Sequence, residues 1–291
     1  MKQARALLCA VVAALAAAAT SSCASSSHPT RAEAHGSAAA VQTGHAPVNG
    51  LSLYYEIHGA NTELPPLVLL HGGGSTIESS FAAVLPSLAR KRQVIAFEQQ
   101  GHGHTADVDR PFSFEQSADD AAALLAHLGL ERADFFGYSN GGSIALQIAM
   151  RHPSLVRRLV VQSAMFRRDG LVPGFFESMD QAKVEDMPAE LREAYLRVAP
   201  KPENLQSFHD KCAKRMIEFK DWPDEWIRGV EAPTLVMVGD ADVVTPEHAV
   251  RTFRLLPHAQ LAILPGTDHM SIVKRADWQV SMIEAFLQAT F

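Results

Sequence analysis

Gly137-Tyr138-Ser139-Asn140-Gly141 places a serine between two glycines. The apolar run 133–136 before it predicts a strand, and residues 143–150 after it carry apolar side chains at helical spacing. A serine on a tight turn from strand to helix is the nucleophile-elbow pattern, in which glycines leave room for the two elements to cross. We therefore expect Ser139 to adopt a strained backbone and to present its hydroxyl outside the fold. The alternative interpretation is a glycine-rich turn with a solvated serine.

Length and composition predict one globular α/β domain with an insertion. The chain has 291 residues, of which 47% are hydrophobic and 20% charged, enough apolar material for a sizeable core. Its net charge of −6 gives no electrostatic reason to bind a polyanion, and no basic stripe is interleaved with aromatic residues. We therefore expect no nucleic-acid partner.

The N-terminal residues predict an export signal. Lys2 and Arg5 precede an apolar run over residues 6–19, which is too short and too rich in alanine to remain as a bilayer anchor. Residues 1–22 are thus interpreted as a signal peptide, and the mature protein as periplasmic or secreted.

Cys23 follows small residues and precedes a polar run, an arrangement that resembles the cysteine of a bacterial lipobox. Lipidation there would attach the protein to a membrane. Thr20 stands where lipoproteins usually carry an aliphatic residue, so ordinary signal cleavage is the alternative. Residues 23–47 lack an apolar period and are expected to form a disordered tether. Cys212 is expected to be a packing residue, without a disulfide.

From residue 51 onward, short apolar runs alternate with amphipathic segments. Strands are predicted at residues 51–57, 67–70, 94–97, 133–136, 159–161, 234–238 and 261–264. Helix start signals occur at Ser113, Thr245 and Ser271. Repeated alternation of this kind predicts a mostly parallel sheet with helices on both faces, in a core formed by residues 48–164 and 231–291.

Residues 165–230 interrupt the alternation with helical patterns and no strand-like run, and they predict an inserted lid. An insertion directly after the strand 159–161 lies over the carboxyl ends of the strands, where Ser139 is expected. The candidate pocket residues are Tyr138, Phe175, Phe176, Trp226 and Met270. The aromatic side chains of the insertion can equally serve to attach it to the core.

A serine hydroxyl needs a base to take its proton and a carboxylate to orient that base. His269, in the loop after the last predicted strand, is the expected base. His248 falls in a predicted helix and His258 in a turn, and both are expected at the surface.

The carboxylate is expected in the loop after the strand 234–238, where Asp240 and Asp242 compete. Asp242 lies further along the loop toward the base and is preferred, whereas Asp240 suits turn hydrogen bonds. Asp268 is adjacent to His269 in a loop, where neighbouring side chains usually diverge, so capping of the terminal helix is its expected role.

Negative charge that develops on a substrate carbonyl also needs hydrogen-bond donors. His71-Gly72-Gly73-Gly74 follows a predicted strand and offers backbone N–H groups that a substrate can approach closely. Gly73 and Asn140 are the expected pair of donors, and His71 is expected to support the turn by hydrogen bonds.

Together with Gln99-Gln100-Gly101-His102-Gly103-His104-Thr105, these motifs resemble the α/β-hydrolase superfamily over residues 49–291, in the order serine, aspartate, histidine. The resemblance implies an eight-stranded, mostly parallel sheet with a helical lid. Ser139 stands where the dehalogenases and epoxide hydrolases of that superfamily use aspartate, which argues against both. Glu98-Gln99-Gln100 departs from the Asp-x-Arg-Gly common at this place, so the salt bridge of that motif is not carried over.

The reaction that the resemblance implies is hydrolysis of a small carboxylic ester or lactone through an acyl-enzyme, without metal or organic cofactor. Hydrolysis of a carbon–carbon bond, cofactor-free perhydrolysis, and ligand binding without turnover are alternatives on the same fold. A metal site on His102-x-His104 is disfavoured because Ala106 stands where the ligand aspartate should be. A phosphate loop at residues 72–76 would lack its lysine.

Overall fold

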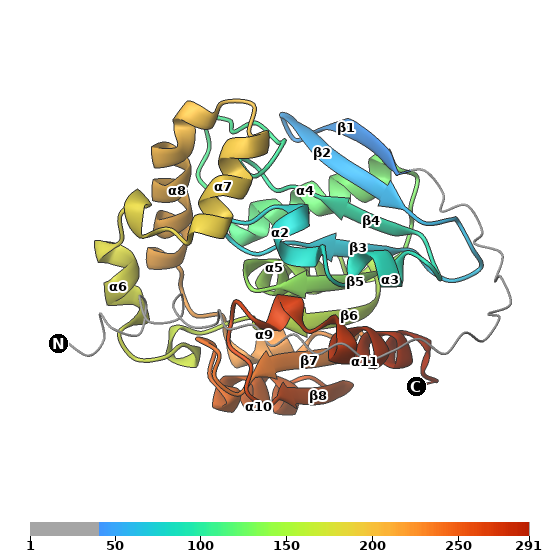
Figure 1. Ribbon diagram of the computed structural model, residues 1–291. Coiled ribbons are helices and arrows are strands. Elements are labelled where there is room, and N and C mark those ends of the chain that lie inside the picture. Colours follow the sequence, from blue (N-terminus) through green and yellow to red (C-terminus); the bar gives the residue numbers. More distant parts are fainter. Residues whose placement is uncertain (1–40, 291) are drawn as a thin grey trace, which may run out of the picture. The chain divides into compact units, whose positions relative to one another are not determined.

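The computed structural model describes residues 41–290, which contain one sheet of eight strands (Figure 1). The strands are β1 (Gln42–Val48), β2 (Leu51–His58), β3 (Leu67–Leu70), β4 (Val94–Phe97), β5 (Ala133–Tyr138), β6 (Val156–Gln162), β7 (Thr234–Gly239) and β8 (Ala259–Leu264). Their order across the sheet is β1-β2-β4-β3-β5-β6-β7-β8. β2 is antiparallel to β1 and to β4, and the other neighbours are parallel. The predicted mostly parallel sheet is confirmed.

Helices cover both faces of this sheet. One face carries α4 (Phe114–His127), α5 (Asn140–Arg151) and α10 (Pro246–Leu255), and the other carries α2 (Ile77–Phe81), α3 (Leu85–Leu88) and α11 (Ala276–Gln288). The alternation along β3 shows why, because Val68 and Leu70 join one hydrophobic core while Leu67 and Leu69 join the other. All four side chains of β3 are buried, as expected for a parallel strand covered on both sides.

β1 extends the sheet beyond the predicted core. The sequence assigns residues 23–47 to a tether, but Gln42–Val48 pairs with β2 in antiparallel register. Ala46 and Val48 are buried, so the strand contributes to the core. The prediction is therefore wrong for this strand, while the signal peptide and Cys23 lie outside the described residues.

The dipeptide Asn49-Gly50 is a sequence signal for the hairpin between β1 and β2. Asn49 and Gly50 both have a positive φ, at 47° and 80°. Two consecutive residues in this conformation form the turn that fits the twist of a two-residue hairpin, and Asn-Gly is the pair that adopts it most readily. The dipeptide thus marks the start of the sheet better than the composition of the segment before it.

Two of the three predicted helix starts are confirmed. The Ser113 hydroxyl accepts a hydrogen bond from the first turn of α4, and the Thr245 hydroxyl accepts one from the first turn of α10. Ser271 does not cap the terminal helix, because a 3₁₀ turn over Ile272–Lys274 follows it and α11 begins only after that turn.

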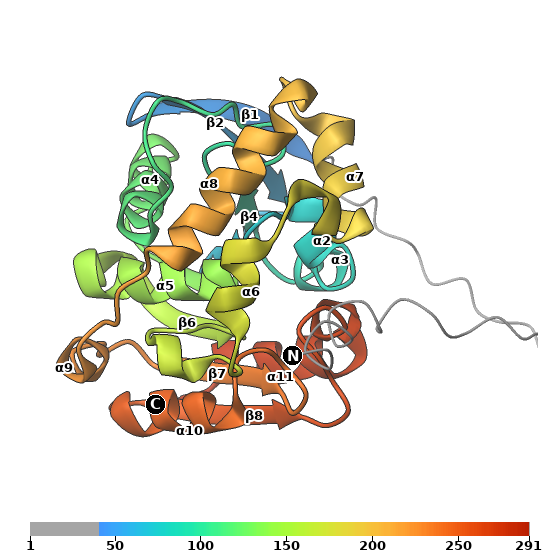
Figure 2. The same ribbon diagram turned by 90° about the vertical axis from the view of Figure 1, so that its left-hand side faces the viewer.

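Between β6 and β7 the chain forms helices and 3₁₀ turns, as predicted for residues 165–230. The helices are α6 (Phe175–Gln181), α7 (Ala189–Val198), α8 (Leu205–Ile217) and α9 (Asp224–Arg228). Figure 2 shows α6, α7 and α8 in front of the sheet. A β-carbon placed on Gly74, just after β3, would lie 3.6 Å from Met187 and 3.8 Å from Leu191. The inserted segment thus covers the turn that follows β3.

His248 is buried rather than exposed, with 4% of its surface accessible. Its Nε2 accepts a hydrogen bond from the Phe166 N–H at 3.2 Å, and the two rings lie 4.6 Å apart. The start of the inserted segment packs on α10 here and covers the imidazole. The predicted surface position is therefore wrong for His248, whereas the side chain of His258 is 55% exposed, as expected.

We expect His248 to make the stability of the protein depend on pH. Burial lowers the pKa of His248 to about 4, compared with about 6.5 in an unfolded chain. Stability that is present above pH ~6.5 is therefore lost as the pH falls toward ~4. When the pH is lowered from ~7 to ~5, the free energy of unfolding measured with urea should fall by about 2 kcal/mol more in the wild type than in His248→Gln. Equal losses in the two proteins would contradict this role.

Candidate active site

Ser139 occupies the turn between β5 and α5, with φ 55° and ψ −123°. Residues other than glycine rarely adopt this region, because the β-carbon crowds the backbone. The Ser139 N–H donates to the Gln162 carbonyl at 2.8 Å, which fixes the turn to β6. The pentapeptide thus forms the strained turn that its sequence predicts.

The glycines of the pentapeptide allow β5, α5 and β3 to approach one another. A β-carbon on Gly137 would lie 2.1 Å from the Gly141 carbonyl oxygen, and one on Gly141 would lie 1.9 Å from the Leu70 carbonyl oxygen. Neither distance is physically allowed for a carbon atom. The expectation that both glycines provide space for the crossing is confirmed, and Gly142 contributes in the same way against Ala164, at 2.7 Å.

The imidazole of His269 lies between Ser139 and Asp242. Its Nε2 is 3.0 Å from Ser139 Oγ, and its Nδ1 is 2.7 Å from Asp242 Oδ1. Since a carboxylate only accepts hydrogen bonds, Nδ1 carries the proton and Nε2 can accept from the serine hydroxyl. Three side chains from three separate loops therefore form one hydrogen-bonded chain.

Asp242 is held in place from several sides. Besides His269, the Val244 N–H donates to Oδ1 at 3.0 Å and the Ser163 hydroxyl donates to Oδ2 at 2.6 Å. Burial opposes ionisation of this carboxyl, but the charge of His269 and these hydrogen bonds outweigh it and lower the pKa of Asp242. Asp240, its competitor, instead accepts from the Thr267 N–H at 3.1 Å, a turn role like the one predicted.

The loop that carries His269 is fixed by its neighbours. The Tyr138 hydroxyl donates to the His269 carbonyl oxygen at 2.6 Å. Asp268 accepts from the Met270 N–H at 3.0 Å and from the Ser271 N–H at 2.7 Å. Asp268 therefore stabilises the turn around His269 rather than capping the terminal helix, which begins further on.

Gly73 and Asn140, the predicted donor pair, lie side by side. A β-carbon on Gly73 would be 2.3 Å from Asn140 Nδ2, and one on Gly72 would be 3.3 Å from the β-carbon of Ser139. Within residues 41–290, neither the Gly73 nor the Asn140 backbone N–H has a hydrogen-bond acceptor. Two free donors beside the serine can stabilise an oxyanion, and the helix dipole of α5 adds to the effect at Asn140.

The His71 side chain stabilises this glycine turn by hydrogen bonds. Its Nε2 accepts from the Gln99 N–H at 3.0 Å, so its Nδ1 carries the proton that is donated to the Gly72 carbonyl at 2.8 Å. Burial lowers the pKa of His71 to about 4, and the ring is neutral at physiological pH. The structural role expected for His71 matches these contacts.

Glu98 forms hydrogen bonds both to α2 and to the loop after β4. Its carboxylate accepts from the Ile77 N–H at 3.3 Å and pairs with His104 Nδ1 at 2.9 Å. The hydrogen bond that His104 Nδ1 donates to Glu98 raises the pKa of His104. The loop after β4 is thereby attached to the first turn of α2, close to the glycine turn.

The predicted pocket residues fall into two groups. Tyr138 is buried, and its ring centroid lies 5.2 Å from that of His269; Met270 is half-buried next to it. Phe175 and Phe176 are half-buried on α6 with their rings 5.4 Å apart. Tyr138 and Met270 thus adjoin His269, whereas Phe175 and Phe176 pack against the hydrophobic core, and the pocket role of all four stays a prediction.

Trp226 differs from the other candidates. It lies on α9, which packs against α10 and α5, and half of its surface, 50%, is exposed. An exposed side chain on this helix does not support the predicted pocket role. The next residue, Ile227, is fully buried and is the apolar side chain through which α9 packs on the core.

Two further side chains at the site were not predicted. Ser163 contacts Asp242, and Arg215 of α8 lies with its Nη2 3.4 Å from a β-carbon built on Gly73. In the sequence, Ser163 only follows a strand and Arg215 stands in a charged helical segment with Lys211 and Lys214. Neither sequence pattern indicates a role at the site, because both roles arise from contacts between residues that are far apart in the sequence.

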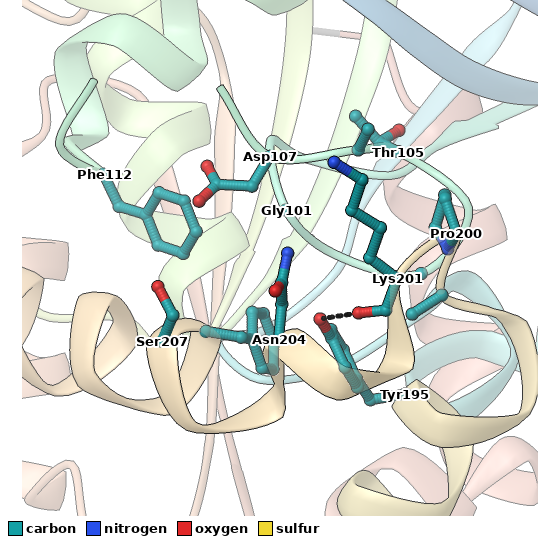
Figure 3. A pocket seen from close by; sticks show the side chains of 13 residues that line it. Gly101, Thr105, Asp107, Phe112, Tyr195, Pro200, Lys201, Asn204 and Ser207 are labelled. Atoms are coloured by element: carbon teal, nitrogen blue, oxygen red, sulfur yellow. Dashed lines mark hydrogen bonds between the residues drawn. The ribbon is translucent and has the colours of Figure 1, made fainter. Parts of the chain in front are cut away.

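A small cavity lies between the loop after β4, the end of α7 and α8 (Figure 3). It encloses about 60 Å³, well below the roughly 300 Å³ of a typical small-molecule site. Its lining residues include Gly101, Asp107, Phe112, Tyr195 and Phe208, and none of Ser139, Asp242 and His269. We therefore do not assign it to the substrate.

Residues 41–290 contain no cluster of three or more histidine, cysteine, aspartate or glutamate side chains arranged to bind a metal ion. Over the same residues, no helix combines the length and apolar character needed to span a bilayer.

Comparison with known proteins shows the family. A model of the α/β-hydrolase fold matches residues 65–217. A 2-hydroxy-6-oxo-2,4-heptadienoate hydrolase from Pseudomonas putida is 31% identical over 252 residues, which cover 77% of this chain and 89% of that protein. The chain belongs to the α/β-hydrolase family, and it is a hydrolase of this fold.

More distant relatives share the same architecture. A serine hydrolase from Mus musculus is 26% identical over 266 residues, which cover 86% of this chain and 87% of that protein. The crystal structure of the enol-lactonase from Burkholderia xenovorans LB400 superposes with a TM-score of 0.67 at 24% identity, covering 84% of this chain and 100% of the other. The second likeness concerns the fold.

Substitution of Gly141 tests the close crossing at the serine turn. In Gly141→Ala the new methyl group would meet the Leu70 carbonyl, a backbone atom that cannot move aside, so we expect a loss of at least about 2 kcal/mol in urea unfolding. Gly229→Ala is the control, because its β-carbon would meet nothing closer than 3.4 Å. If both variants were as stable as the wild type, the crossing would not be as tight as described.

Proposed function

We propose that this protein is a serine hydrolase that cleaves a small carboxylic ester or lactone through an acyl-enzyme. The observation that carries the proposal is the hydrogen-bonded chain from Ser139 through His269 to Asp242, with distances of 3.0 and 2.7 Å. These distances lie within reach for direct proton transfer. The free N–H groups of Gly73 and Asn140 beside the serine support the same reaction.

In the proposed reaction, Ser139 Oγ attacks the substrate carbonyl while His269 Nε2 takes its proton. The imidazolium is stabilised by Asp242, and the carbonyl oxygen, now negative, accepts hydrogen bonds from the Gly73 and Asn140 N–H groups. His269 then gives the proton to the leaving alkoxide. Water repeats the sequence on the acyl-enzyme, releases the acid and restores the serine hydroxyl.

Ser139→Ala tests the nucleophile. We expect the wild type to react covalently with a fluorophosphonate probe, and the variant to show no labelling and at least about 10⁴-fold lower kcat on p-nitrophenyl acetate. Ser117→Ala removes a buried hydroxyl of α4 that donates to the Ser113 carbonyl and is not part of the triad, and it should keep labelling. A folded wild type that the probe does not label would favour a ligand-binding protein without turnover.

Arg215 indicates that the substrate carries a carboxylate. The guanidinium is 5% exposed, and its Nη1 donates to Gln99 Oε1 at 3.1 Å. Within residues 41–290, its Nε and Nη2 have no hydrogen-bond partner, and no carboxylate forms an ion pair with it. Burial lowers the pKa of Arg215, but an arginine stays protonated in proteins.

An unpaired buried cation is costly unless a ligand supplies the opposite charge. Arg215 Nη2 lies beside Gly73, so an anion bound there would be adjacent to the proposed oxyanion site. A planar guanidinium with two free donor groups matches a carboxylate. We therefore propose an acidic substrate whose reacting carbonyl lies a short distance from its carboxylate.

The same observation favours a second candidate reaction. The Pseudomonas putida relative is named for a heptadienoate with a 6-oxo group, which is an acid with a separate ketone. Hydrolysis at such a ketone breaks a carbon–carbon bond, and the same three side chains and oxyanion donors can catalyse it. The two candidates are separated by supplying 2-hydroxy-6-oxo-2,4-heptadienoate and an acidic ester in parallel and comparing kcat/KM.

Arg215→Met tests the acidic substrate. For p-nitrophenyl hydrogen glutarate we expect kcat/KM to fall about 10- to 100-fold, mainly through KM, because the carboxylate loses its partner. For p-nitrophenyl butyrate, which lacks the carboxylate, kcat/KM should change little. Arg254→Met is the control, since Arg254 is exposed on α10 and is not among the candidate pocket residues. Equal losses for both esters in Arg215→Met would contradict the carboxylate site.

We further infer that the protein is exported, either with Cys23 lipidated or after ordinary signal-peptidase cleavage. The basic residues and apolar run at the N-terminus support this inference. Both forms would present the hydrolase outside the cytoplasmic membrane.

A further inference from the structure

Ser163 is strained without an evident reason in its own sequence. It follows β6 and has φ 53°, one of three positive values among the non-glycine residues of the described chain. The others are Asn49 in the hairpin, where asparagine tolerates this conformation, and Ser139 itself. A serine held in this region is strained, and strain of this kind persists where the surrounding structure requires it.

Residues 162 and 163 connect the two strands that carry Ser139 and Asp242. The Gln162 carbonyl accepts from the Ser139 N–H at 2.8 Å, and the Ser163 N–H donates to the Met237 carbonyl of β7 at 2.8 Å. The Ser163 hydroxyl then reaches Asp242 Oδ2 at 2.6 Å. Two adjacent residues thus contact the nucleophile turn and the acid, Gln162 through its carbonyl and Ser163 through its hydroxyl.

The Ser163 hydroxyl donates a hydrogen bond to Asp242 Oδ2, for which the described residues offer no second donor. Asp242 Oδ1 accepts from His269 and from the Val244 N–H, whereas within residues 41–290 Oδ2 accepts from Ser163 alone. The Asp242 side chain is fully buried, with 0% exposed, so solvent cannot replace the lost donor. A distance of 2.6 Å is typical of a hydroxyl bound to an ionised carboxylate, which is a strong hydrogen bond.

We propose that Ser163 is a positioning residue that fixes the plane of the Asp242 carboxylate and limits the negative charge directed at His269. The proposal rests on the proposed function. Because Ser163 binds Oδ2, the carboxylate cannot rotate away from His269 Nδ1. Because the hydroxyl shares the charge of the carboxylate, less negative charge faces His269 Nδ1.

The other titratable groups that face Asp242 come from neighbouring loops. Tyr138 of β5 has a pKa raised by burial and by the charge of Asp242, so it stays neutral. Asp240 and Asp268 are engaged by backbone N–H groups of the loop after β8. Loss of the Ser163 hydroxyl changes none of these contacts, so its effect on pH dependence is exerted through Asp242 and His269.

Two variants separate the hydroxyl from the backbone strain. Ser163→Ala removes the hydroxyl and keeps the β-carbon at positive φ, whereas Ser163→Gly removes both the hydroxyl and the strain. We expect both to lower kcat about 10- to 100-fold with little change in KM, since the base is no longer held in position. In both, the acid limb of the kcat/KM profile should move to higher pH.

The control for these variants is Ser117→Ala, which removes a buried hydroxyl that donates to the Ser113 carbonyl at 2.9 Å on α4. Its kcat and acid limb should match the wild type. A readout without substrate completes the design, namely the low-field proton NMR resonance of His269 Nδ1–H, which should shift in both Ser163 variants and stay in place in the control.

The outcomes are distinct. Wild-type kcat, acid limb and Nδ1–H resonance in Ser163→Ala would overturn the proposal. Normal activity in Ser163→Gly with loss only in Ser163→Ala would also overturn it, because backbone strain and not the hydroxyl would then be responsible. Since the resonance is measured without turnover, a wild type that lacks serine reactivity would refute the proposed function while the Ser163 contact is still tested.

Discussion

The close crossing of α5 over β3 and β5 is the constraint on which the site depends. At Gly137 and Gly141, distances of 2.1 and 1.9 Å from a virtual β-carbon to backbone oxygens leave no room for any side chain. Only with these elements in contact can Ser139 take up φ 55° and face His269. The strain at one serine is therefore maintained by packing on both sides of it. The burial of β3 on both faces provides the rigid support for that packing.

Electrostatic balance distinguishes the two buried charges at the site. Asp242 has three hydrogen-bond donors, and its pKa is lowered although burial opposes ionisation. Arg215 is as deeply buried, yet Gln99 is its hydrogen-bond partner within the described residues. The carboxylate of Asp242 has its hydrogen-bond donors within the folded protein, whereas Nε and Nη2 of Arg215 have no acceptor among the described residues. This contrast is the basis on which we propose an acidic substrate.

Local sequence signals predicted the elements that depend on local chemistry. The pentapeptide around Ser139, the caps at Ser113 and Thr245, and the alternation of strands and helices each follow from short-range geometry. The hairpin strand β1 was missed because composition outweighed the Asn49-Gly50 signal. Ser163 and Arg215 could not be found, because their roles come from contacts with Asp242 and Gly73, 79 and 142 residues away in the sequence. His248 was misplaced since helical position alone does not tell which face the inserted segment covers.

A crystal structure of the protein after reaction with a small alkyl phosphonate, which imitates the tetrahedral intermediate, would test the proposed role of Ser139 most directly. We expect a covalent bond from phosphorus to Ser139 Oγ. The phosphoryl oxygen should lie within hydrogen-bond distance of the Gly73 and Asn140 N–H groups, with His269 still bound to Asp242. A phosphonate attached to another residue, or a phosphoryl oxygen turned away from both N–H groups, would contradict the central claim.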